Sequence, residues 1–413
     1  MQDTELYRHL LGLAAPWSVA RVQLDVSGQQ VDVWVEHVKG TRWPCPTCGR
    51  ELGLYDHAAE RVWRHLDSCQ FATQLHASVP RVDCPEHGVH QVKLPWAEER
   101  SRFTLMFERF AIGVMLETDL SGAMRILRIG WDAAFHMMER AVARGKLAKK
   151  SARPTLIGVD ETSVARGHHY ITVVSDLAEG TVEHLSADRR IESLSSYYKT
   201  LSDEELTSIK AVSMDMHVAY ISATEQHVPN WHRKIVFDRF HVMQQLTNAV
   251  DLVRKAEHRA LLENGDKTLL GSKYVWLYSE ENLPARYNVR FEQLRALDLK
   301  TSRAWAIKEN LRRLWEFRRL GVAKKYWKRW LDWALRSQLA PIVRAAKTLE
   351  RHVGGIFAFF ENRVTNAMAE GINAAIQRIK RAAHGYRNLE NFMTAIFFHC
   401  GGLQLCPPTH TED

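Results

Sequence analysis

The order of strand-like and helix-like segments between residues 155 and 241 limits this chain to one class of fold. Three consecutive segments carry the apolar, β-branched pattern of strands, at 155–161, 168–177 and 181–188. A helix, a strand, a second helix and a further strand follow, with the strands at 209–216 and 234–241. Consecutive strands followed by alternating helices and strands are typical of a mixed sheet with crossover helices. We therefore expect an α/β domain in this part of the chain.

Two of these strand segments end in an aspartate, Asp160 after TLIGV and Asp215 after AVSM. The carboxyl edge of a buried strand is where α/β proteins form their sites, although a single aspartate there is often a turn residue or a helix cap. Two on neighbouring strands could share a divalent cation, because Mg²⁺ prefers carboxylate oxygens. A helix could supply a third carboxylate, for which Glu370 in AMAEGIN is the candidate. Taken alone, Glu370 also fits an ordinary solvated side chain.

The first 100 residues predict a small β-rich unit that holds a metal ion. Alternating residues at 22–26 and 31–35 indicate a hairpin, and a third alternating run covers 71–79. Two pairs of metal-ligating residues lie among them: Cys45-x-x-Cys48 and Cys84-x-x-His87. Three thiolates and one imidazole are a tetrahedral zinc set, and a unit with little core of its own gains stability from such a metal. Individual ligands could instead be Cys69, His65 or His90.

Residues 103–145 change to a helical period, with two helices around a turn at Gly130. This outline is that of a helix-turn-helix, although ordinary helical hairpins share it. The second helix carries Trp131, His136 and Arg140, which are the candidate DNA contacts there.

The positive charge of the chain is concentrated in one helical segment. Residues 300–351 contain 15 Lys and Arg but only 4 Asp and Glu, so their net charge is 15 − 4 = +11. This is more than the net charge of +8 of the whole chain. Such a segment favours a polyanionic partner. It also holds Trp305, Trp315, Trp327, Trp330 and Trp333. Tryptophans at helical spacing are more often core residues than stacking platforms for bases.

Composition restricts the location of the protein. No apolar run approaches the ~18 residues of a membrane helix. Six cysteines in 413 residues are too few for a disulfide scaffold. We expect a cytoplasmic, reduced protein that does not enter a membrane.

Taken together, these segments resemble the ISL3 family of bacterial insertion-sequence transposases. The resemblance rests on CPTCGR and CPEHG, on PWAEERSRFT, on LIGVDETSVARGHHYITVVSDL and AVSMDMHVAYISA, on KIVFDRFHVMQQL, and on NAMAEGIN with IKRAAHGYRNLENFMTAIFFHCGGL. It covers nearly the whole chain.

The resemblance implies a DDE transposase with an RNase H-like core, whose two aspartates and glutamate match Asp160, Asp215 and Glu370. These carboxylates would bind two Mg²⁺ ions, for which Mn²⁺ could substitute, and one structural Zn²⁺ would lie near the N-terminus. Asp238 and His241 resemble a D-x-x-H element, which could support the site or only the strand. Many DDE enzymes carry a basic residue seven positions after the glutamate, whereas this chain has Gln377.

The expected domains are a zinc unit at 1–100, a helix-turn-helix at 101–150, the catalytic core at 151–250 and 355–413, and a helical basic insertion at 251–354. Besides the helix-turn-helix, the expected DNA contacts are Arg312, Arg313, Arg318, Arg319, Arg378, Lys380 and Arg387.

The resemblance implies that such a protein binds double-stranded DNA, both the terminal inverted repeats of its element and the target, on the bacterial nucleoid. It would cleave and join strands as a homodimer or higher homo-oligomer. Two alternatives remain open: an RNase H-like nuclease that cannot join ends, and a non-enzymatic zinc and helix-turn-helix regulator.

Overall fold

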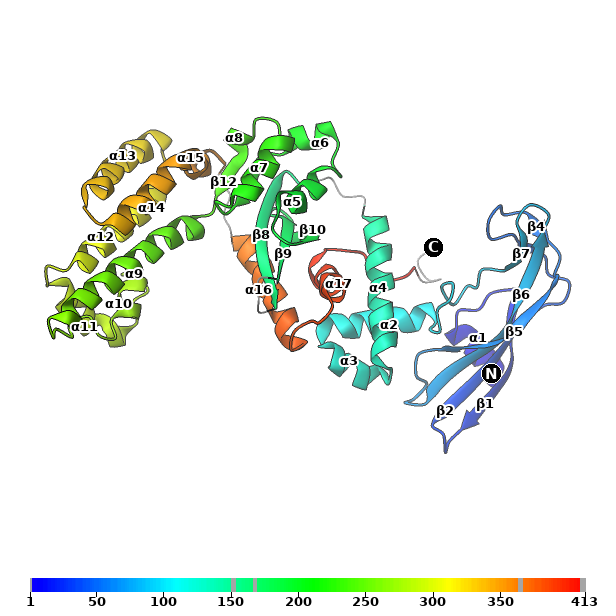
Figure 1. The fold of residues 1–413 in the computed structure, drawn as a ribbon. Helices are drawn as coiled ribbons and strands as arrows, with labels where there is room; N and C mark the ends of the chain where they lie inside the picture. The colour runs from blue at the N-terminus through cyan, green and yellow to red at the C-terminus, as the bar shows by residue number, and fades with distance from the viewer. Residues whose placement is uncertain (1, 150–153, 166–168, 363–366, 409–413) are drawn as a thin grey trace. The chain divides into compact units, whose positions relative to one another are not determined.

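The computed structural model of the 413-residue chain describes residues 2–149, 154–165, 169–362 and 367–408. The chain divides into two compact units, and Figure 1 labels their helices and strands. Met1–Lys150 and Phe397–Asp413 form the first unit, and Ser151–Ile396 forms the second. No helix within these described ranges is long and apolar enough to cross a membrane.

A five-stranded sheet dominates the start of the first unit, in the order β1-β2-β6-β5 with β7 paired to β6. The expected hairpin is confirmed, because β1 and β2 pair antiparallel. The alternation in β5 is too weak to predict a strand, since Trp63 is its only buried residue. The elements are α1 (Asp3–Leu10), β1 (Trp17–Asp25), β2 (Gln30–His37), β3 (Trp43–Pro44), β4 (Glu51–Leu52), β5 (Asp56–Arg64), β6 (Ala72–Cys84) and β7 (Gly88–Gln91).

Three helices follow in the same unit: α2 (Leu105–Glu117), α3 (Leu120–Leu127) and α4 (Trp131–Ala148). The Thr104 side chain caps α2 by accepting a bond from the Phe107 amide, and Asp119 caps α3 through the Gly122 amide. Arg128 ends α3 in the left-handed conformation, and Gly130 is the N-cap of α4. The predicted turn at Gly130 is therefore present, and DNA reading by α4 stays a prediction.

The second unit is built on a mixed five-stranded sheet in the order β10-β9-β8-β11-β12. β8 pairs antiparallel with β9 and parallel with β11, which pairs parallel with β12. All five strands expected from the sequence are present. They are β8 (Leu156–Ala165), β9 (His169–Asp176), β10 (Thr181–Ala187), β11 (Ala211–Met214) and β12 (Ile235–Phe237). The crossover segments form α5 (Ile191–Tyr198), α6 (Asp203–Ser208), α7 (Val218–His227) and α8 (Trp231–Lys234).

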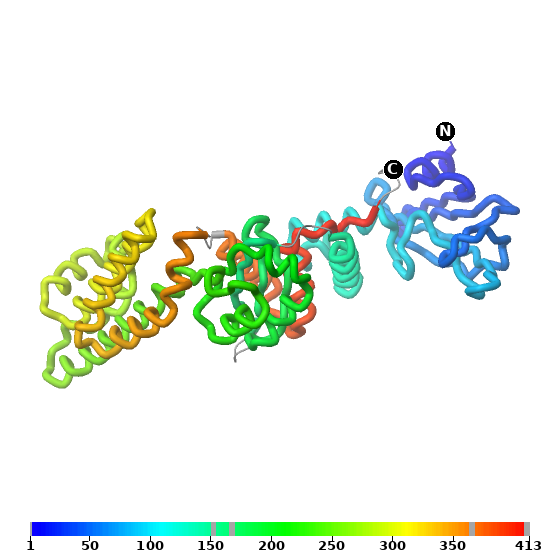
Figure 2. Tube along the Cα trace, turned by 90° about the horizontal axis from the view of Figure 1, so that it is seen from above, coloured from blue at the N-terminus to red at the C-terminus, as the bar shows by residue number. Residues whose placement is uncertain are grey.

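The helical insertion begins after β12, and at the end of the insertion the chain returns to the sheet, as the tube in Figure 2 traces from green to orange. Its helices are α9 (Arg239–Glu263), α10 (Lys273–Leu277), α11 (Ala285–Arg295), α12 (Lys300–Arg312), the 3₁₀ helix η1 (Arg313–Glu316), α13 (Leu320–Arg336), α14 (Ala340–Arg351) and α15 (Val353–Asn362). α16 (Ala367–Ala382) then contacts β8, and α17 (Leu389–Cys400) follows.

Tryptophans of the insertion fill its core, as their spacing predicted. Four of the five are buried, and only Trp333 is largely exposed, at 43%. Trp330 on α13 is 1% exposed, and its indole N–H donates to the Ile307 carbonyl at 2.9 Å. The basic side chains of α13 lie on the opposite, exposed face, among them Lys324, Lys325, Lys328 and Arg329.

These two tryptophans of α13 make a matched pair for a stability test. Trp330→Ala removes a fully buried ring and should lower the free energy of unfolding of the second unit by about 3–5 kcal/mol. Trp333→Ala should change it by less than about 1 kcal/mol, because the ring is largely solvated. Denaturant unfolding of the whole chain, followed by circular dichroism, measures both. Equal effects would show that the insertion core is not built around Trp330.

Candidate active site and zinc centre

Asp160 lies within β8, and Asp215 and Asp238 directly follow the neighbouring parallel strands β11 and β12. Ser213 of β11 is in register with Gly158 of β8, and Met214 with Phe237 of β12. Continuing both registers places Asp215 beside Asp160 on one side and beside Asp238 on the other. Residues level with one another in a sheet point to the same face. By this continued register, Asp215 and Asp238, the residues that follow β11 and β12, share one face of the sheet with Asp160.

Asp160 differs from the sequence prediction in its place on the strand. We expected it to end the strand, but β8 continues to Ala165. The reason is that β9 pairs with β8 as far as Ala165, whereas β11 pairs with it only up to Gly158. Asp160 is thus two residues beyond the last parallel pair and in the middle of a strand that continues by antiparallel pairing with β9.

Polar side chains of α16 bind the same strand. The Asn373 amide donates to Oδ2 of Asp160 at 2.5 Å, and the Gln377 amide donates to Oγ1 of Thr162 at 3.0 Å. Lys380 Nζ donates to the Ser163 carbonyl at 2.6 Å. These side chains recur every three or four residues, so they form one stripe of the helix. Glu370 is one turn before Asn373 on the same stripe.

The carboxylates share a face without forming a compact cluster. Asp160 Oδ1 accepts a bond from the Glu161 amide, and Asp215 Oδ1 accepts one from the His217 amide at 2.9 Å. Glu370 is exposed and lines a pocket of about 560 Å³ together with Ser213 and Asp238. We call this space the insertion pocket. Within the described ranges, no three carboxylates have oxygens within 4.8 Å of one another.

Negative charges near the proposed site also act on Tyr220, a buried tyrosine of α7. The Tyr220 hydroxyl bonds to Thr172 Oγ1 at 3.0 Å. Burial raises the pKa of Tyr220, and the negative charges of Glu161, Asp215 and Asp160 raise it further. Neighbouring carboxylates repel one another, and a bound cation would relieve that repulsion. Hard carboxylate oxygens fit Mg²⁺ or Mn²⁺ by donor type.

Asp238 begins α9. Its Oδ1 accepts a bond from the Phe240 amide at 3.0 Å, and its Oδ2 lies 3.8 Å from His241 Nε2. Asp238 is 8% exposed and in contact with the insertion pocket. The contacts show a helix cap at the edge of the site, and direct support of catalysis by the pair stays a prediction.

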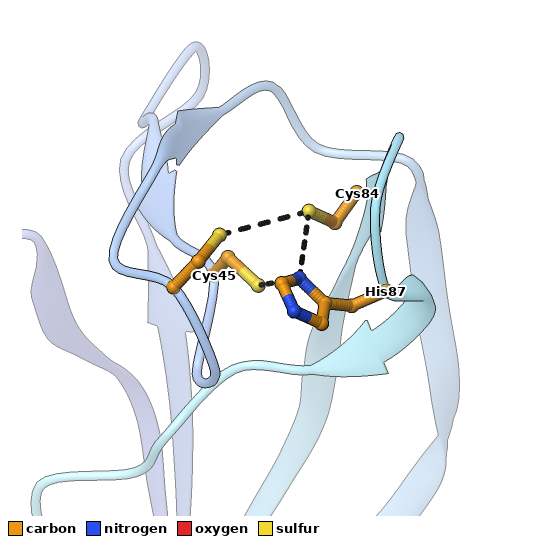
Figure 3. Close-up of side chains that lie close together, drawn as sticks. Cys45, Cys84 and His87 are labelled. Atoms are coloured by element: carbon orange, nitrogen blue, oxygen red, sulfur yellow. Dashed lines mark hydrogen bonds between the residues drawn. The ribbon is translucent and has the colours of Figure 1, made fainter.

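The four predicted zinc ligands meet in the first unit, and Figure 3 labels three of them, Cys45, Cys84 and His87. One ligand atom from each of Cys45, Cys48, Cys84 and His87 lies within 4.8 Å of the others. The sulfurs of Cys48 and Cys84 are 3.8 Å apart, and Cys84 Sγ is 3.4 Å from His87 Nδ1. Zn–S bonds of about 2.3 Å at tetrahedral angles place two sulfurs about 3.8 Å apart. The donor set and its spacing therefore fit one Zn²⁺.

Backbone amides stabilise thiolates in this cluster. Those of Cys48 and Thr47 lower the pKa of the Cys45 thiol, and that of Glu86 lowers the pKa of Cys84. For Cys48 the Arg50 amide acts in the same direction, but desolvation and the neighbouring thiols raise its pKa overall. A cation among the three sulfurs would favour the thiolate form of all of them.

The residues considered as alternative zinc ligands either form other hydrogen bonds or lie outside the cluster. Burial lowers the pKa of His65 to about 4, and His65 Nδ1 bonds to Thr104 Oγ1 at 2.9 Å. His90 bonds to the His87 carbonyl through Nε2. Cys69 is exposed and is not a member of the cluster.

The predicted DNA contacts of α4 differ in their environment. Trp131 is 45% exposed and stacks on Phe135, and His136 is also exposed. Arg140 instead forms an ion pair with Glu108, whose side chain is 1% exposed. This pairing gives Arg140 a packing role that its position in the sequence did not reveal.

The arginines predicted in the insertion and on α16 also differ. Arg312 is held by Glu309 at 3.1 Å, whereas Arg313, Arg318 and Arg319 are exposed. On α16 and beyond it, Arg378 and Arg387 are exposed. Lys324, Lys325, Lys328 and Arg329 were not singled out from the sequence, although their alternation with buried tryptophans marks an exposed helical face.

Two family models match the chain. That of the ISL3 DDE domain, described as a transposase, matches residues 157–396, and that of the ISL3 zinc ribbon, described as the zinc-finger of transposase IS204/IS1001/IS1096/IS1165, matches residues 41–87. Among curated proteins, the transposase for insertion sequence element IS1557 of Mycobacterium tuberculosis is 26% identical over 417 residues, which cover 94% of this chain and 93% of that protein. The transposase for insertion sequence element IS1001 of Bordetella parapertussis is 26% identical over 357 residues, which cover 85% of this chain and 87% of that protein.

The zinc centre predicts one Zn²⁺ per purified chain. Cys84→Ser should lose nearly all of it, because one of four ligands is replaced by a poor one. Cys69→Ser is the matched control, since Cys69 is exposed and outside the cluster, and it should keep the metal. Elemental analysis of the folded proteins measures the zinc content. Full zinc in Cys84→Ser, or folded wild-type protein without zinc, would contradict this assignment.

Proposed function

This chain belongs to the ISL3 family of transposases, and on that premise we propose that it cuts and joins DNA at the ends of its element through Asp160, Asp215 and Glu370. One observation carries the proposal. The register of β8 and β11, continued past their last pair, makes Asp160 level with Asp215, and Glu370 is one turn before Asn373, whose amide donates to Asp160.

The order of the strands supports an RNase H-like core. Three antiparallel strands, β10, β9 and β8, continue into the parallel strands β11 and β12, and crossover helices connect the parallel ones. The strand at the centre carries Asp160, and its parallel neighbour leads into Asp215. In this proposal the insertion interrupts the core between β12 and α16.

The carboxylates would hold Mg²⁺, or Mn²⁺ in its place, and such ions when bound supply an activated attacking oxygen and stabilise the leaving one. Asn373 orients Asp160 by holding its Oδ2. Lys380 reaches the backbone of β8, and the exposed Arg378 on the same helix is available to a DNA phosphate. The chain's own contribution is therefore to position acidic groups and DNA.

The first unit is the proposed reader of the terminal inverted repeats. Trp131 and His136 project from the first two turns of α4, where a recognition helix contacts base edges. The Arg128 guanidinium, in the turn before α4, donates to Asp67 and to the Gln70 carbonyl at 2.9 Å. The loop between β5 and β6 thus holds this turn in place. Pairing of two ends requires at least two copies, so we propose a homodimer or a larger assembly.

Catalysis is tested by removing one carboxylate charge at a time. Asp160→Asn, Asp215→Asn and Glu370→Gln should each lower cleavage of terminal-repeat DNA in Mg²⁺ by more than about a hundredfold. Mutation of a residue that only hydrogen-bonds to a metal ligand already lowers activity by roughly 10–100-fold. Binding to the repeat should change little. Glu390→Gln, an exposed glutamate on α17, is the control. Near-normal cleavage by any of the three would remove that residue from the site.

Joining must be measured separately, because it distinguishes the rival functions. Wild-type protein given pre-cleaved ends and a target plasmid should produce joined DNA. Cleavage without joining would indicate a nuclease. Binding without metal-dependent cleavage would indicate a regulator.

The exposed face of α13 predicts contacts with DNA phosphates. Changing Lys324, Lys325, Lys328 and Arg329 to Gln should weaken binding to repeat and random DNA by similar factors. The slope of log K against log salt should shrink by up to ~0.9 for each phosphate that the protein no longer neutralises. Arg336→Gln, on the same helix, is the control, because Arg336 already pairs with Asp332 at 2.8 Å. Loss of sequence preference at unchanged affinity for random DNA would instead make the insertion the reader.

A further inference from the structure

A second pocket lies within the first unit, between the end of α1, the residues after β5 and the start of α2. Its volume is about 480 Å³, which is within the range of sites for small molecules. Nothing in the proposed reaction uses this space, which we call the α2 pocket. Most of its wall is apolar, and the apolar lining includes Leu10, Leu11, Leu66, Trp96, Met106 and Phe110.

A buried histidine supplies a polar group to this wall. His65 is 6% exposed, and burial lowers its pKa to about 4, so the ring is uncharged near pH 7 and carries a hydrogen on only one nitrogen. Thr104 Oγ1 lies 2.9 Å from His65 Nδ1, and it already accepts a bond from the Phe107 amide. The hydroxyl hydrogen of Thr104 is therefore left for Nδ1, which places the hydrogen of the histidine on Nε2.

The Nε2–H of His65 is an unused donor at the wall of the pocket. It makes no hydrogen bond to any residue in the described ranges, although a buried ring nitrogen normally makes one. It is also not one of the side-chain atoms that are sealed from solvent. Because His65 lines the α2 pocket, this space gives access to the N–H. The donor is therefore available to an acceptor on a bound molecule.

The start of α2 makes the same wall attractive to an anion. Met106 is in the first turn of this 13-residue helix, and its amide donates to no carbonyl in the described part of the chain. The N-terminus of a helix carries a partial positive charge, and its amides bind anionic groups. His9 and Arg109 also line the pocket, whereas none of the described lining residues is acidic. The wall therefore matches a molecule with an anionic head and an apolar body.

We propose that the α2 pocket binds a small amphiphilic carboxylate, a molecule with one carboxylate on an aliphatic chain or an aromatic ring. The carboxylate accepts hydrogen bonds from His65 Nε2 and from the Met106 amide. The apolar body lies against Leu10, Trp96 and Phe110. The pocket belongs to the first unit, whereas the proposed catalytic carboxylates belong to the second, so this binding does not depend on cleavage or joining.

Calorimetric titration of the full chain with octanoate tests the proposal, and octanol is the uncharged comparison. Octanoate should bind at one site per chain, about tenfold more tightly than octanol, because hydrogen bonds to a charged group are the stronger ones. His65→Phe keeps the ring shape but removes the donor. This variant should lower the affinity for octanoate to about that for octanol, and it should leave octanol binding unchanged.

Two tryptophan variants of α2 keep the test decisive if His65→Phe does not fold. Met106 and Leu116 are 37% and 42% exposed, but only Met106 lines the pocket. Met106→Trp should fill the pocket and abolish octanoate binding, whereas Leu116→Trp should bind octanoate as the wild type does. The proposal is overturned if octanoate does not bind the wild type, if it binds no better than octanol, or if the two tryptophan variants behave alike.

Discussion

The hydrogen bonds between α16 and β8 hold the proposed active site together. The chain leaves the sheet after β12 and returns only after seven α-helices of insertion, α9 to α15. Closing so long a loop costs conformational entropy, and the insertion offsets this cost with its own tryptophan-rich core. Asn373, Gln377 and Lys380 then fix the rotation and height of α16 against the strand. Together with the buried Ala369, Ile372 and Ile376 of the same helix, they set the position of Glu370 relative to Asp160.

Charge and hydrophobicity are separated within the insertion, which lets one element serve two purposes. Trp327 and Trp330 turn inward on α13, while lysines on the same helix face solvent. The core stabilises the loop that returns Glu370 to the sheet. The exposed cations are available to DNA phosphates, whose contacts give affinity without sequence preference. Preference would then come from the first unit, where the four candidate zinc ligands accompany a sheet with its own apolar core around Trp17, Trp63 and Trp96.

Local patterns predicted much of this architecture, and contacts between distant segments escaped them. Alternation and apolar runs identified the five strands of the second unit, and residue spacing identified the zinc ligands. The strand β5 carries only one buried residue, so it left no pattern. No local signal showed that Arg140 pairs with Glu108, or that Asn373 reaches Asp160, because each partner is far away in sequence. The continuation of β8 beyond Asp160 likewise depends on its pairing with β9, and the pattern of residues within β8 does not show where this pairing ends.

The central claim is that Asp160, Asp215 and Glu370 surround one divalent-metal site. Iron-mediated cleavage of the polypeptide tests it directly, because Fe²⁺ in place of Mg²⁺ generates radicals that cut the backbone nearby. The full chain bound to end DNA should be cut near residues 160, 215 and 370 together, and Asp160→Asn should lose all three cuts. Cuts near 160 and 215 with none near 370 would contradict the account, since Glu370 would then lie outside the site.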